Sequence, residues 1–440
     1  LNKCAYINNN KITNKDINDI KDSEKKLASK ALRVLGFAYK EINDIPKNAT
    51  EVINEENNLN FAGLLGMIDP PRDTVIKSVE MCKNAGIRPI MITGDSLDTA
   101  SAIAKEIGII DNDNEGILGN ALDNYTDEEL EQIVKNYSVY ARVNPEHKER
   151  IVKAWQKNGK VVAMTGDGVN DAPAIKDAHV GVGMGITGTD VTKSAADIVL
   201  MDDSFSTIII AVEEGRRIYD NILKVIQFLL SSNVGEIVVL FLATMLTPLL
   251  AKWFGISDIN HLEILLPIHI LWINLVTDSL PAIALGLEPE EKDIMNRKPI
   301  DSRKGIFSDG LWSKIIIEGI MIGMLTLISF SIGNKYYSLE IGRTMAFITI
   351  GMLELIHSFN IKSDKSILEV GIMENKYLIG SFLLGVFVQN IVAIIPTFAD
   401  IFELHTLNST QWIITIIISF MPIPIMELQK LVNKERLSKK

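Results

Sequence analysis

Six long apolar segments in the second half of the chain constrain its fold more than any other feature. A membrane-spanning helix needs about 20 predominantly apolar residues to cross a hydrocarbon core about 30 Å thick. The segments lie at about 221–247, 265–287, 312–332, 341–360, 377–396 and 412–431. Because an α-helix satisfies its own backbone polar groups in lipid, the sequence predicts an all-α transmembrane domain with six helices over residues 213–440.

The distribution of basic residues predicts how these segments are oriented. Lys and Arg cluster beside alternate ends of the segments, and cytoplasmic loops carry such an excess. The clusters are Arg216, Arg217 and Lys224; Lys292, Arg297, Lys298, Arg303 and Lys304; Lys362, Lys365 and Lys376; and the tail from Lys430 to Lys440. The opposite loops carry only Lys252, Lys335 and Arg343. We therefore expect the first 212 residues and both long charged loops to be cytoplasmic.

Those first residues alternate strand and helix patterns. Apolar strands are predicted in "LNFAGLLGMIDPPR" (59–72), "RPIMITGD" (88–95), "YSVYARVNP" (137–145), "KVVAMTGD" (160–167), "HVGVGM" (179–184) and "DIVLM" (197–201). Helices are predicted at Ser23–Val34, Thr74–Ala85, Ser96–Ile107 and in "EHKERIVKAWQKN" (146–158). Such alternation favours a parallel sheet with crossover helices, which binds ligands at the carboxyl ends of its strands.

Composition excludes some classes of protein. A formal net charge of −11 argues against a general nucleic-acid binder. Cys4 and Cys82 are far apart and lack the spacing of metal ligands, so we expect two reduced thiols. The glycines of "GVGMG" (181–185) resemble a dinucleotide loop, but no acidic residue follows at the required distance.

Two aspartates follow a predicted strand in the turn "TGDGVNDAPA" (165–174). Mg²⁺ prefers one or two carboxylates together with water and phosphate oxygens, and Asp167 and Asp171 offer such carboxylates. Thr93 and Gly94, after another strand, offer a hydroxyl and an N–H to a phosphate, and Lys148 offers a positive charge. The alternative is a pair of turn-capping aspartates. The ten residues together favour a phosphoryl-transfer site.

Polar residues inside the apolar segments predict a second site. Asn233 and Glu236 share one helix face, and Asn274, Thr277 and Asp278 share another. Polar groups in a bilayer are costly and are usually functional. These side chains offer only oxygen ligands, which favour a hard cation over copper or zinc. Interhelical hydrogen bonding is the alternative, but it explains two carboxylates at mid-membrane poorly.

Other polar residues in these segments have different expected roles. Pro281 is expected to loosen the backbone and free carbonyl oxygens for a cation. Gln389 and Asn390 are expected to be packing groups, and His269 and His357 to be structural rather than ligands.

The motifs together resemble the C-terminal half of a P-type cation-transporting ATPase, most similar to calcium pumps of the sarcoplasmic reticulum and bacterial type. The resemblance covers nearly the whole chain. It rests on "DPPR" (69–72), "MITGD" (91–95), "ARVNPEHK" (141–148), "TGDGVNDAPA" (165–174), "DDSFSTII" (202–209), "SSNVGE" (231–236) and "NLVTDSLPAIALGLE" (274–288). It implies a remnant of a nucleotide-binding domain over 1–58 and the C-terminal part of a haloacid dehalogenase-like phosphorylation domain over 59–212.

The resemblance also implies roles for single residues. It assigns Asp167 to Mg²⁺ with Asp171 in support, and Lys148, Thr93, Gly94 and Asp95 to the phosphate and its transfer. Arg33 and Arg142 would contact the nucleotide. In two-site calcium pumps the fourth span here would carry a Glu where this chain has Gly351. Either Glu354, one turn later, substitutes for it or one cation site is lost.

The family's phosphorylated motif, Asp-Lys-Thr-Gly, does not occur in these 440 residues, nor does Thr-Gly-Glu-Ser. We therefore expect a fragment of a calcium pump that is inactive alone, most simply through truncation. The complete protein would use ATP and Mg²⁺, transport Ca²⁺, and act as a monomer in a bacterial plasma membrane. The alternatives are a Na⁺ or Mn²⁺ pump of the same family, a non-enzymatic membrane remnant, and a standalone phosphatase of the dehalogenase type.

Overall fold

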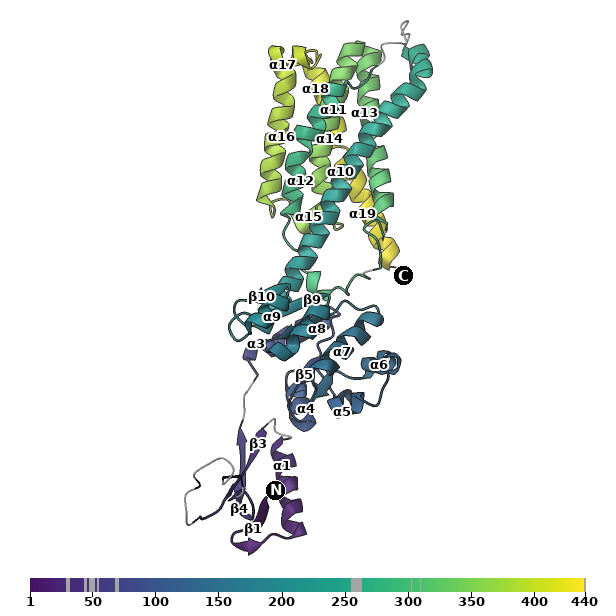
Figure 1. Cartoon of the computed structure of the whole chain (residues 1–440). Helices are drawn as coiled ribbons and strands as arrows, with labels where there is room; N and C mark the ends of the chain where they lie inside the picture. The colour runs from purple at the N-terminus through teal and green to yellow at the C-terminus, as the bar shows by residue number, and fades with distance from the viewer. Residues whose placement is uncertain are drawn as a thin grey trace. The chain divides into compact units, whose positions relative to one another are not determined.

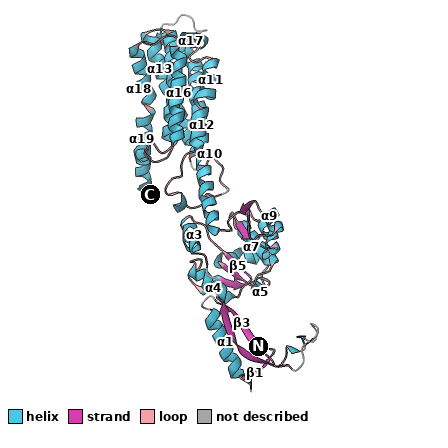
Figure 2. Ribbon diagram, turned by 90° about the vertical axis from the view of Figure 1, so that its left-hand side faces the viewer, coloured by secondary structure: helices cyan, strands magenta, loops and turns pink. Residues whose placement is uncertain are grey.

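The computed structural model describes residues 1–28, 32–42, 46, 52–53, 55–67, 71–254, 263–301, 303–308 and 310–438. The chain divides into two compact units, residues 1–213 with 295–302 and residues 214–294 with 303–440. All strands of the described residues belong to the first unit, and the second unit is helical (Figures 1 and 2). This arrangement confirms the predicted fold class, an α/β part and a helical membrane part.

A four-stranded sheet forms the N-terminal region, with strand order β2-β1-β4-β3. Its strands are β1 (Cys4–Ile7), β2 (Asn10–Lys11), β3 (Arg33–Tyr39) and β4 (Leu59–Met67), and α1 (Asn14–Ala28) connects β2 to β3. β4 is central because it pairs in parallel with β1 and antiparallel with β3. The sheet therefore depends on segments more than 50 residues apart in the chain.

The structure corrects the sequence prediction in this region. The helix predicted at Ser23–Val34 is wrong in its second half, because α1 ends at Ala28 and Arg33 begins a strand. Pairing with β4 along all seven residues of β3 outweighs the local helical pattern. The domain boundary expected after residue 58 falls within this sheet, since β4 completes it. Pro70, expected to close β4, lies outside the described residues.

The rest of the first unit contains two three-stranded parallel sheets, with orders β5-β7-β6 and β10-β9-β8. Their strands are β5 (Met91–Thr93), β6 (Gly116–Leu118), β7 (Val139–Ala141), β8 (Ala163–Gly166), β9 (Val180–Met184) and β10 (Ile198–Leu200). The helices are α3 (Asp73–Asn84), α4 (Leu97–Glu106), α5 (Gly119–Leu122), α6 (Asp127–Ile133), α7 (Pro145–Lys157), α8 (Ala172–Asp177) and α9 (Asp190–Ala195). β6 has no counterpart in the sequence prediction.

Burial explains why β7 lies at the centre of its sheet. All three of its residues are fully buried, as expected for a strand covered on both faces. Tyr140 packs in a cluster with Leu122, Leu130 and Trp155, which come from α5, α6 and α7. The three helices thus fix the carboxyl end of β7, and α7 begins a few residues after it.

The second unit contains the predicted membrane segments. Its main helices are α10 (Phe205–Phe254, which begins in the first unit), α11 (Pro267–Trp272), α12 (Ser279–Gly286), α13 (Leu311–Tyr336), α14 (Leu339–Ile361), α16 (Lys376–Ile394), α18 (Ser409–Phe420) and α19 (Pro422–Ser438). The short helices α15 (Ile367–Val370) and α17 (Pro396–Ile401) lie before and after α16. A π-helical turn, η5 (Ile273–Thr277), separates α11 from α12.

Five helical stretches of the described residues are long and apolar enough to cross a membrane. They are Phe205–Met245, Pro267–Gly286, Leu311–Tyr336, Lys376–Ile394 and Ser409–Val432. The remaining predicted segment, at 341–360, forms α14, which is buried along nearly its whole length. Neighbouring helices surround α14, so it presents little surface to lipid.

Close packing of α10 against α13 depends on three glycines. A Cβ atom on Gly319 of α13 would lie 2.4 Å from Val234 Cγ1 of α10, and one on Gly323 would lie 2.6 Å from Val238 Cγ1. On the facing side, a Cβ on Gly235 would lie 2.8 Å from Ile322 Cγ2. Small residues at four-residue spacing allow membrane helices to approach closely in this way.

We expect Gly319→Ala to destabilise the membrane unit by about 1–3 kcal/mol, because the added methyl group overpacks the contact with Val234. Gly380→Ala in α16 is the matched control, since nothing lies within 4 Å of its Cβ position. Thermal unfolding in detergent measures both variants. Equal melting temperatures for the two variants would contradict the packing argument.

Candidate functional site

Asp171 organises the turn that follows β8. Its Oδ2 accepts hydrogen bonds from the backbone N–H groups of Asp167 (3.3 Å) and Gly168 (3.1 Å). The side chain packs so closely on Gly166 that a Cβ there would lie 2.4 Å from Asp171 Cβ. Asp171 is buried, whereas Asp167 is exposed. The two carboxylates therefore have different tasks, since one holds the loop and the other faces solvent.

Lys148 reaches this turn from the first turn of α7 and forms an ion pair with Asp171. α7 starts where it does because Pro145 occupies its first turn and Asn144 caps it, with Asn144 Oδ1 accepting from the N–H of His147 (2.8 Å). Gly119 allows this corner to form, because a Cβ there would lie 2.5 Å from the carbonyl oxygen of Arg142. The lysine predicted from sequence thus lies beside the predicted aspartates.

Asp167 has the environment that a Mg²⁺ ligand requires. Its described contacts are made by its backbone, since its carbonyl oxygen accepts from Thr189 N (3.0 Å) and Thr192 Oγ1 (3.2 Å). These bonds fix the residue while its carboxylate remains open to solvent. An exposed carboxylate on a fixed backbone at a strand end fits Mg²⁺, which retains several of its waters.

Thr93 is the last residue of β5, and Gly94 and Asp95 form the turn after it. Thr93 Oγ1 accepts from Asp95 N (3.1 Å), and the Asp95 carbonyl accepts from Arg142 N (3.1 Å). Arg142 follows β7 and has the left-handed φ of 50°. The turns after β5 and β7 are thus joined by backbone bonds.

The turn after β5 and the turn after β8 follow strands that share a core. Ile92 of β5 packs against the cluster that contains Met164 of β8. Gly94 is exposed, with nothing within 4 Å of its Cβ position, so its N–H is accessible. Arg33 is not brought into this group by any described contact, because it begins β3 in the N-terminal sheet and its side chain lies outside what is described.

Sequence reasoning missed the role of Asp203, which anchors the loop after β9. Its carboxylate accepts N–H bonds from Gly185 (2.7 Å), Ile186 (3.0 Å) and Thr187 (2.7 Å), and the Thr187 hydroxyl donates another (2.8 Å). The bonds from Ile186 and Thr187 hold the pKa of Asp203 at about 2. The available signal was an Asp in "DDSFSTII" facing the glycine-rich "GMGITG".

In the membrane unit, Glu236 of α10 faces Asn274 of η5. The Asn274 amide nitrogen donates to both carboxylate oxygens of Glu236 at 2.9 Å and to the Ile270 carbonyl at 3.1 Å. Glu236 is buried. The amide therefore links two helices and orients the carboxylate. Asn233 is not part of this link, since its amide donates to Leu229 O of its own helix (2.7 Å).

Asp278 and Glu354 join Glu236 in a cluster that we call the carboxylate cluster. Asp278 is 1% exposed and Glu354 is 0% exposed. Asp278 lies within electrostatic reach of Glu236 and Glu354, and Ser232 lies close to it. Among the described residues, nothing makes a hydrogen bond of normal geometry to the carboxylate of Asp278 or Glu354, or to the Thr277 hydroxyl. Buried oxygen atoms without such partners call for an explanation, such as an ordered water or an ion.

The backbone around this cluster departs from a regular helix. Asp278 N donates to Ile273 O (3.0 Å), a bond across five residues that defines the π-helical turn. Such turns are frequent at functional sites. Pro281 has no N–H to offer to Thr277 O. The predicted loosening therefore coincides with a wider turn that begins eight residues before the proline.

The fourth predicted span contributes Glu354 rather than Gly351. A Cβ on Gly351 would lie 2.6 Å from Gln389 Nε2, so this glycine makes room for a glutamine. Gln389 accepts from Trp272 Nε1 (3.0 Å) and donates to Phe347 O (3.0 Å). These contacts are those of a packing group, and Glu354 is the α14 residue at the carboxylate cluster.

The remaining polar side chains make structural contacts. His269 Nε2 lies 2.7 Å from Phe402 O, and its Nδ1 accepts from Leu266 N at 3.2 Å. Asn390 donates to Val386 O (2.7 Å). Within the described ranges, no three acidic, histidine or cysteine side chains converge closely enough to form a metal site by themselves. Cation binding at the carboxylate cluster would therefore need its side chains to come closer together.

Comparisons with known proteins match the two units separately. Residues 262–432 match the family model of the cation transporting ATPase C-terminus, and residues 10–179 match that of haloacid dehalogenase-like hydrolase. The chain is 47% identical to calcium-transporting ATPase 1 of Bacillus cereus over 99% of this chain and 49% of that protein. It is 43% identical to the calcium-transporting ATPase of Bacillus subtilis over 90% of this chain and 43% of that protein. It is 36% identical to an endoplasmic reticulum calcium ATPase of Aspergillus fumigatus over 91% of this chain and 44% of that protein. The chain thus spans about half the length of these relatives or less.

We expect Asp203→Asn to lower the melting temperature near neutral pH, because three backbone N–H groups lose a charged acceptor. The native pKa of about 2 lies below the ordinary value of 3.8, so the stabilisation is complete above about pH 4 and is lost as pH falls towards 2. Melting curves of the unmodified protein and of Asp203→Asn between pH 6 and 2 measure the difference in melting temperature. Asp190→Asn, in an exposed helix turn, is the control. A difference that stays constant down to pH 2 would refute the assignment.

Proposed function

This chain belongs to the P-type cation-transporting ATPases, and we propose that it forms the half of an ATP-driven calcium pump that carries the cation-binding residues and part of the phosphorylation site. The carboxylate cluster is the observation that carries this proposal. Three acidic side chains are buried among membrane helices, and two of them have no hydrogen-bond partner among the described residues. A divalent cation offsets the cost of burying them.

Calcium suits this cluster better than a soft metal does. Ca²⁺ takes six to eight oxygen ligands in flexible geometry, and the cluster and its neighbours offer carboxylate, hydroxyl, amide and backbone oxygens. Three carboxylates carry more negative charge than Na⁺ would balance. The relatives above are named calcium-transporting, which favours Ca²⁺ over Mn²⁺.

The turns after β5 and β8 serve phosphoryl transfer in this proposal. Asp167 would hold Mg²⁺, which supplies charge neutralisation for a phosphate when bound. Lys148 keeps Asp171 in position and adds positive charge to the same corner. Thr93 and Gly94 offer a hydroxyl and an N–H to phosphate oxygens. The Asp that is phosphorylated would come from the part of the relatives that this chain does not span.

Helix α10 is the element through which the two sites communicate in this proposal. It begins two residues after Asp203, whose carboxylate holds the loop after β9, and continues to Glu236 without interruption. A movement of that loop on phosphorylation would displace the α10 backbone and change the distance between Glu236 and Asn274. The chain is an integral membrane protein. We further propose a bacterial plasma membrane and a monomeric complete pump.

We expect Thr277→Val in the complete pump to reduce calcium uptake at least about tenfold, which corresponds to about 1.4 kcal/mol, because a buried hydroxyl ligand is lost. Thr244→Val is the matched control, since within the described ranges the Thr244 hydroxyl donates to Leu240 O of its own helix (2.9 Å). Radioactive calcium uptake into vesicles measures both variants, and sodium and manganese are run in parallel. Unchanged uptake in Thr277→Val would exclude Thr277 as a ligand.

We expect Asp167→Asn in the complete pump to abolish magnesium-dependent phosphorylation by ATP while leaving equilibrium calcium binding within about threefold. The reason is that Asp167 is exposed and its backbone bonds do not involve its carboxylate. Asp190→Asn serves again as the control. Incorporation of labelled phosphate is measured at rising magnesium concentration. Normal phosphorylation in Asp167→Asn would rule out this residue as the Mg²⁺ ligand.

A further inference from the structure

A second buried acidic group lies outside the carboxylate cluster. Glu318 of α13 is 1% exposed and faces Gln227 of α10 and His357 of α14. Gln227 Nε2 donates to both carboxylate oxygens of Glu318, at 2.7 and 2.9 Å, and His357 Nε2 lies 3.4 Å from Glu318 Oε2. His357 is fully buried. Three helices thus converge on a carboxylate and an imidazole that the calcium ligands do not include.

The packing of α10 on α13 brings this group together. Gly319 follows Glu318 directly, and the lack of a Cβ there lets α13 approach the backbone of Ser231 and the side chain of Val234. Gln227 lies one helical turn before Ser231 on α10, so it faces Glu318 at the same close contact. The position of the carboxylate is therefore fixed by backbone packing.

Unpartnered polar atoms continue from this pair in both directions along α14. Among the described residues, His357 Nδ1 and both side-chain polar atoms of Asn360 have no hydrogen-bond partner, although both residues are buried. Glu354, His357 and Asn360 are spaced by three residues and therefore lie along one side of the helix. Buried polar atoms of this kind are normally satisfied by water. These three residues, which we call the stripe on α14, run from the carboxylate cluster to the end of α14 that is predicted to be cytoplasmic.

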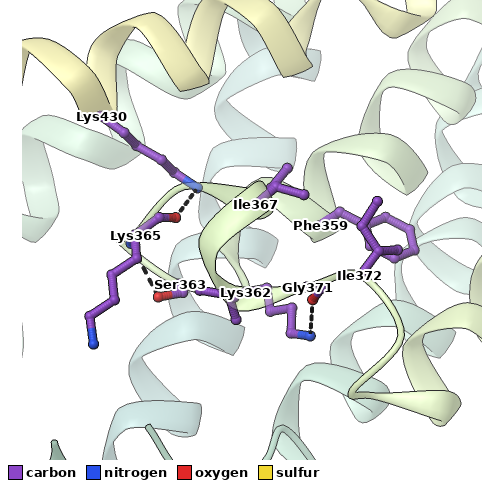
Figure 3. A pocket seen from close by; sticks show the side chains of 9 residues that line it. Phe359, Lys362, Ser363, Lys365, Ile367, Gly371, Ile372 and Lys430 are labelled. Carbon is purple, nitrogen blue, oxygen red and sulfur yellow. Dashed lines mark hydrogen bonds between the residues drawn. The ribbon is translucent and has the colours of Figure 1, made fainter. Parts of the chain in front are cut away.

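A small cavity lies at that end (Figure 3). Its volume is about 10 Å³, room for about one water molecule, and its lining includes Phe359, Lys362 and Lys430. Lys430 Nζ donates to the backbone oxygens of Asn360 (2.9 Å) and Lys365 (3.1 Å). The stripe on α14 therefore ends beside this small cavity, whose lining includes two lysines.

Other charged groups face the pair from the neighbouring elements. Lys430 of α19 lies within electrostatic reach of Glu318, Glu427 and Lys314. Lys314, one turn before Glu318 on α13, forms an ion pair with Asp364 (2.6 Å). Lys430 lies 3.8 Å from Glu427. Both lysines thus have acidic partners of their own. In the part of the chain that the structure describes, His357 is the ionisable group within hydrogen-bond distance of Glu318.

We propose that Glu318 and His357 form a proton-binding site that exchanges protons between the carboxylate cluster and the cytoplasmic end of the membrane unit. In one state the pair consists of a carboxylate and a neutral imidazole, with a net charge of −1. In the other state it holds one more proton, taken from water at the cytoplasmic end and bound at His357 Nδ1 while Nε2–H donates to Glu318 Oε2, with a net charge of zero. The role of this pair in calcium transport rests on the proposed function, whereas its ability to bind a proton does not.

The geometry favours a proton over a metal ion at this site. The Gln227 amide nitrogen occupies the position in front of both carboxylate oxygens where a cation would bind. One carboxylate and one imidazole are too few ligands for a buried metal. An imidazole can take up and release a proton at one ring nitrogen while the other holds a hydrogen bond, and the Nδ1 of His357 has no partner among the described residues.

The first test uses this chain alone in lipid nanodiscs. Infrared difference spectra between pH 8 and pH 5 record changes at carboxyl and imidazole groups. We expect bands that disappear in Glu318→Gln and His357→Gln but remain in the controls Glu374→Gln and His405→Gln, whose side chains are exposed. Glutamine preserves size and hydrogen bonding, so folding should be retained, and circular dichroism checks this. Bands that persist unchanged in both variants of the pair would overturn the proposal.

The second test separates proton binding from calcium transport. In the complete pump we expect both variants of the pair to keep calcium affinity within about threefold while the pH dependence of calcium uptake between pH 5 and 8 flattens by at least about threefold. A merely structural role would lower uptake equally at every pH, and that result would overturn the proposed exchange. If the unmodified pump takes up no calcium, the proposed function fails, and the infrared result alone decides whether the pair binds a proton.

Discussion

The cost of burying carboxylates among membrane helices is the constraint on which the second unit depends. A carboxylate at the centre of a membrane helix costs roughly 3 kcal/mol on insertion scales, and this chain buries Glu236, Asp278 and Glu354 together. Such a cluster persists only if bound cations or protons offset that cost. The surrounding packing must therefore hold the three helices in position while leaving the carboxylates free to respond to a ligand.

Two backbone features meet this requirement. Glycines on α10 and α13 let these helices approach until single methyl groups would clash, and this packing fixes the face that carries Glu236. The π-helical turn at Ile273–Thr277 does the opposite, because it loosens the helix just before Asp278. The helix that carries Glu236 is thus tightly packed, whereas the backbone next to Asp278 has groups that can adjust. The same packing of α10 on α13 also positions Gln227 against Glu318, so the two buried acidic sites share one structural origin.

Local chemistry made much of the fold and candidate site predictable. The strands before Thr93 and Asp167 are apolar runs closed by glycine-containing turns, and Asn144 with Pro145 marks the start of α7. By contrast, the local pattern around Arg33 favours a helix, and only pairing with β4 makes the segment a strand. The roles of Asp203 and Glu318 are hard to predict for a related reason, since their partners lie 16 or more residues away. Sequence spacing alone cannot show whether Glu354 or Gly351 of α14 lies at the carboxylate cluster.

The sequence by itself determined which segments are apolar enough for lipid, which turns carry carboxylates, and which polar side chains inside the apolar segments offer oxygen atoms. These properties follow from residue type and short spacing. The tertiary structure decided which of those side chains meet: that Asp171 holds the loop while Asp167 faces solvent, that Asn233 turns back to its own helix, and that His357 meets a carboxylate. The physical reason is that helix and strand periodicity defines faces, whereas the pairing of faces depends on backbone approach between segments distant in the chain.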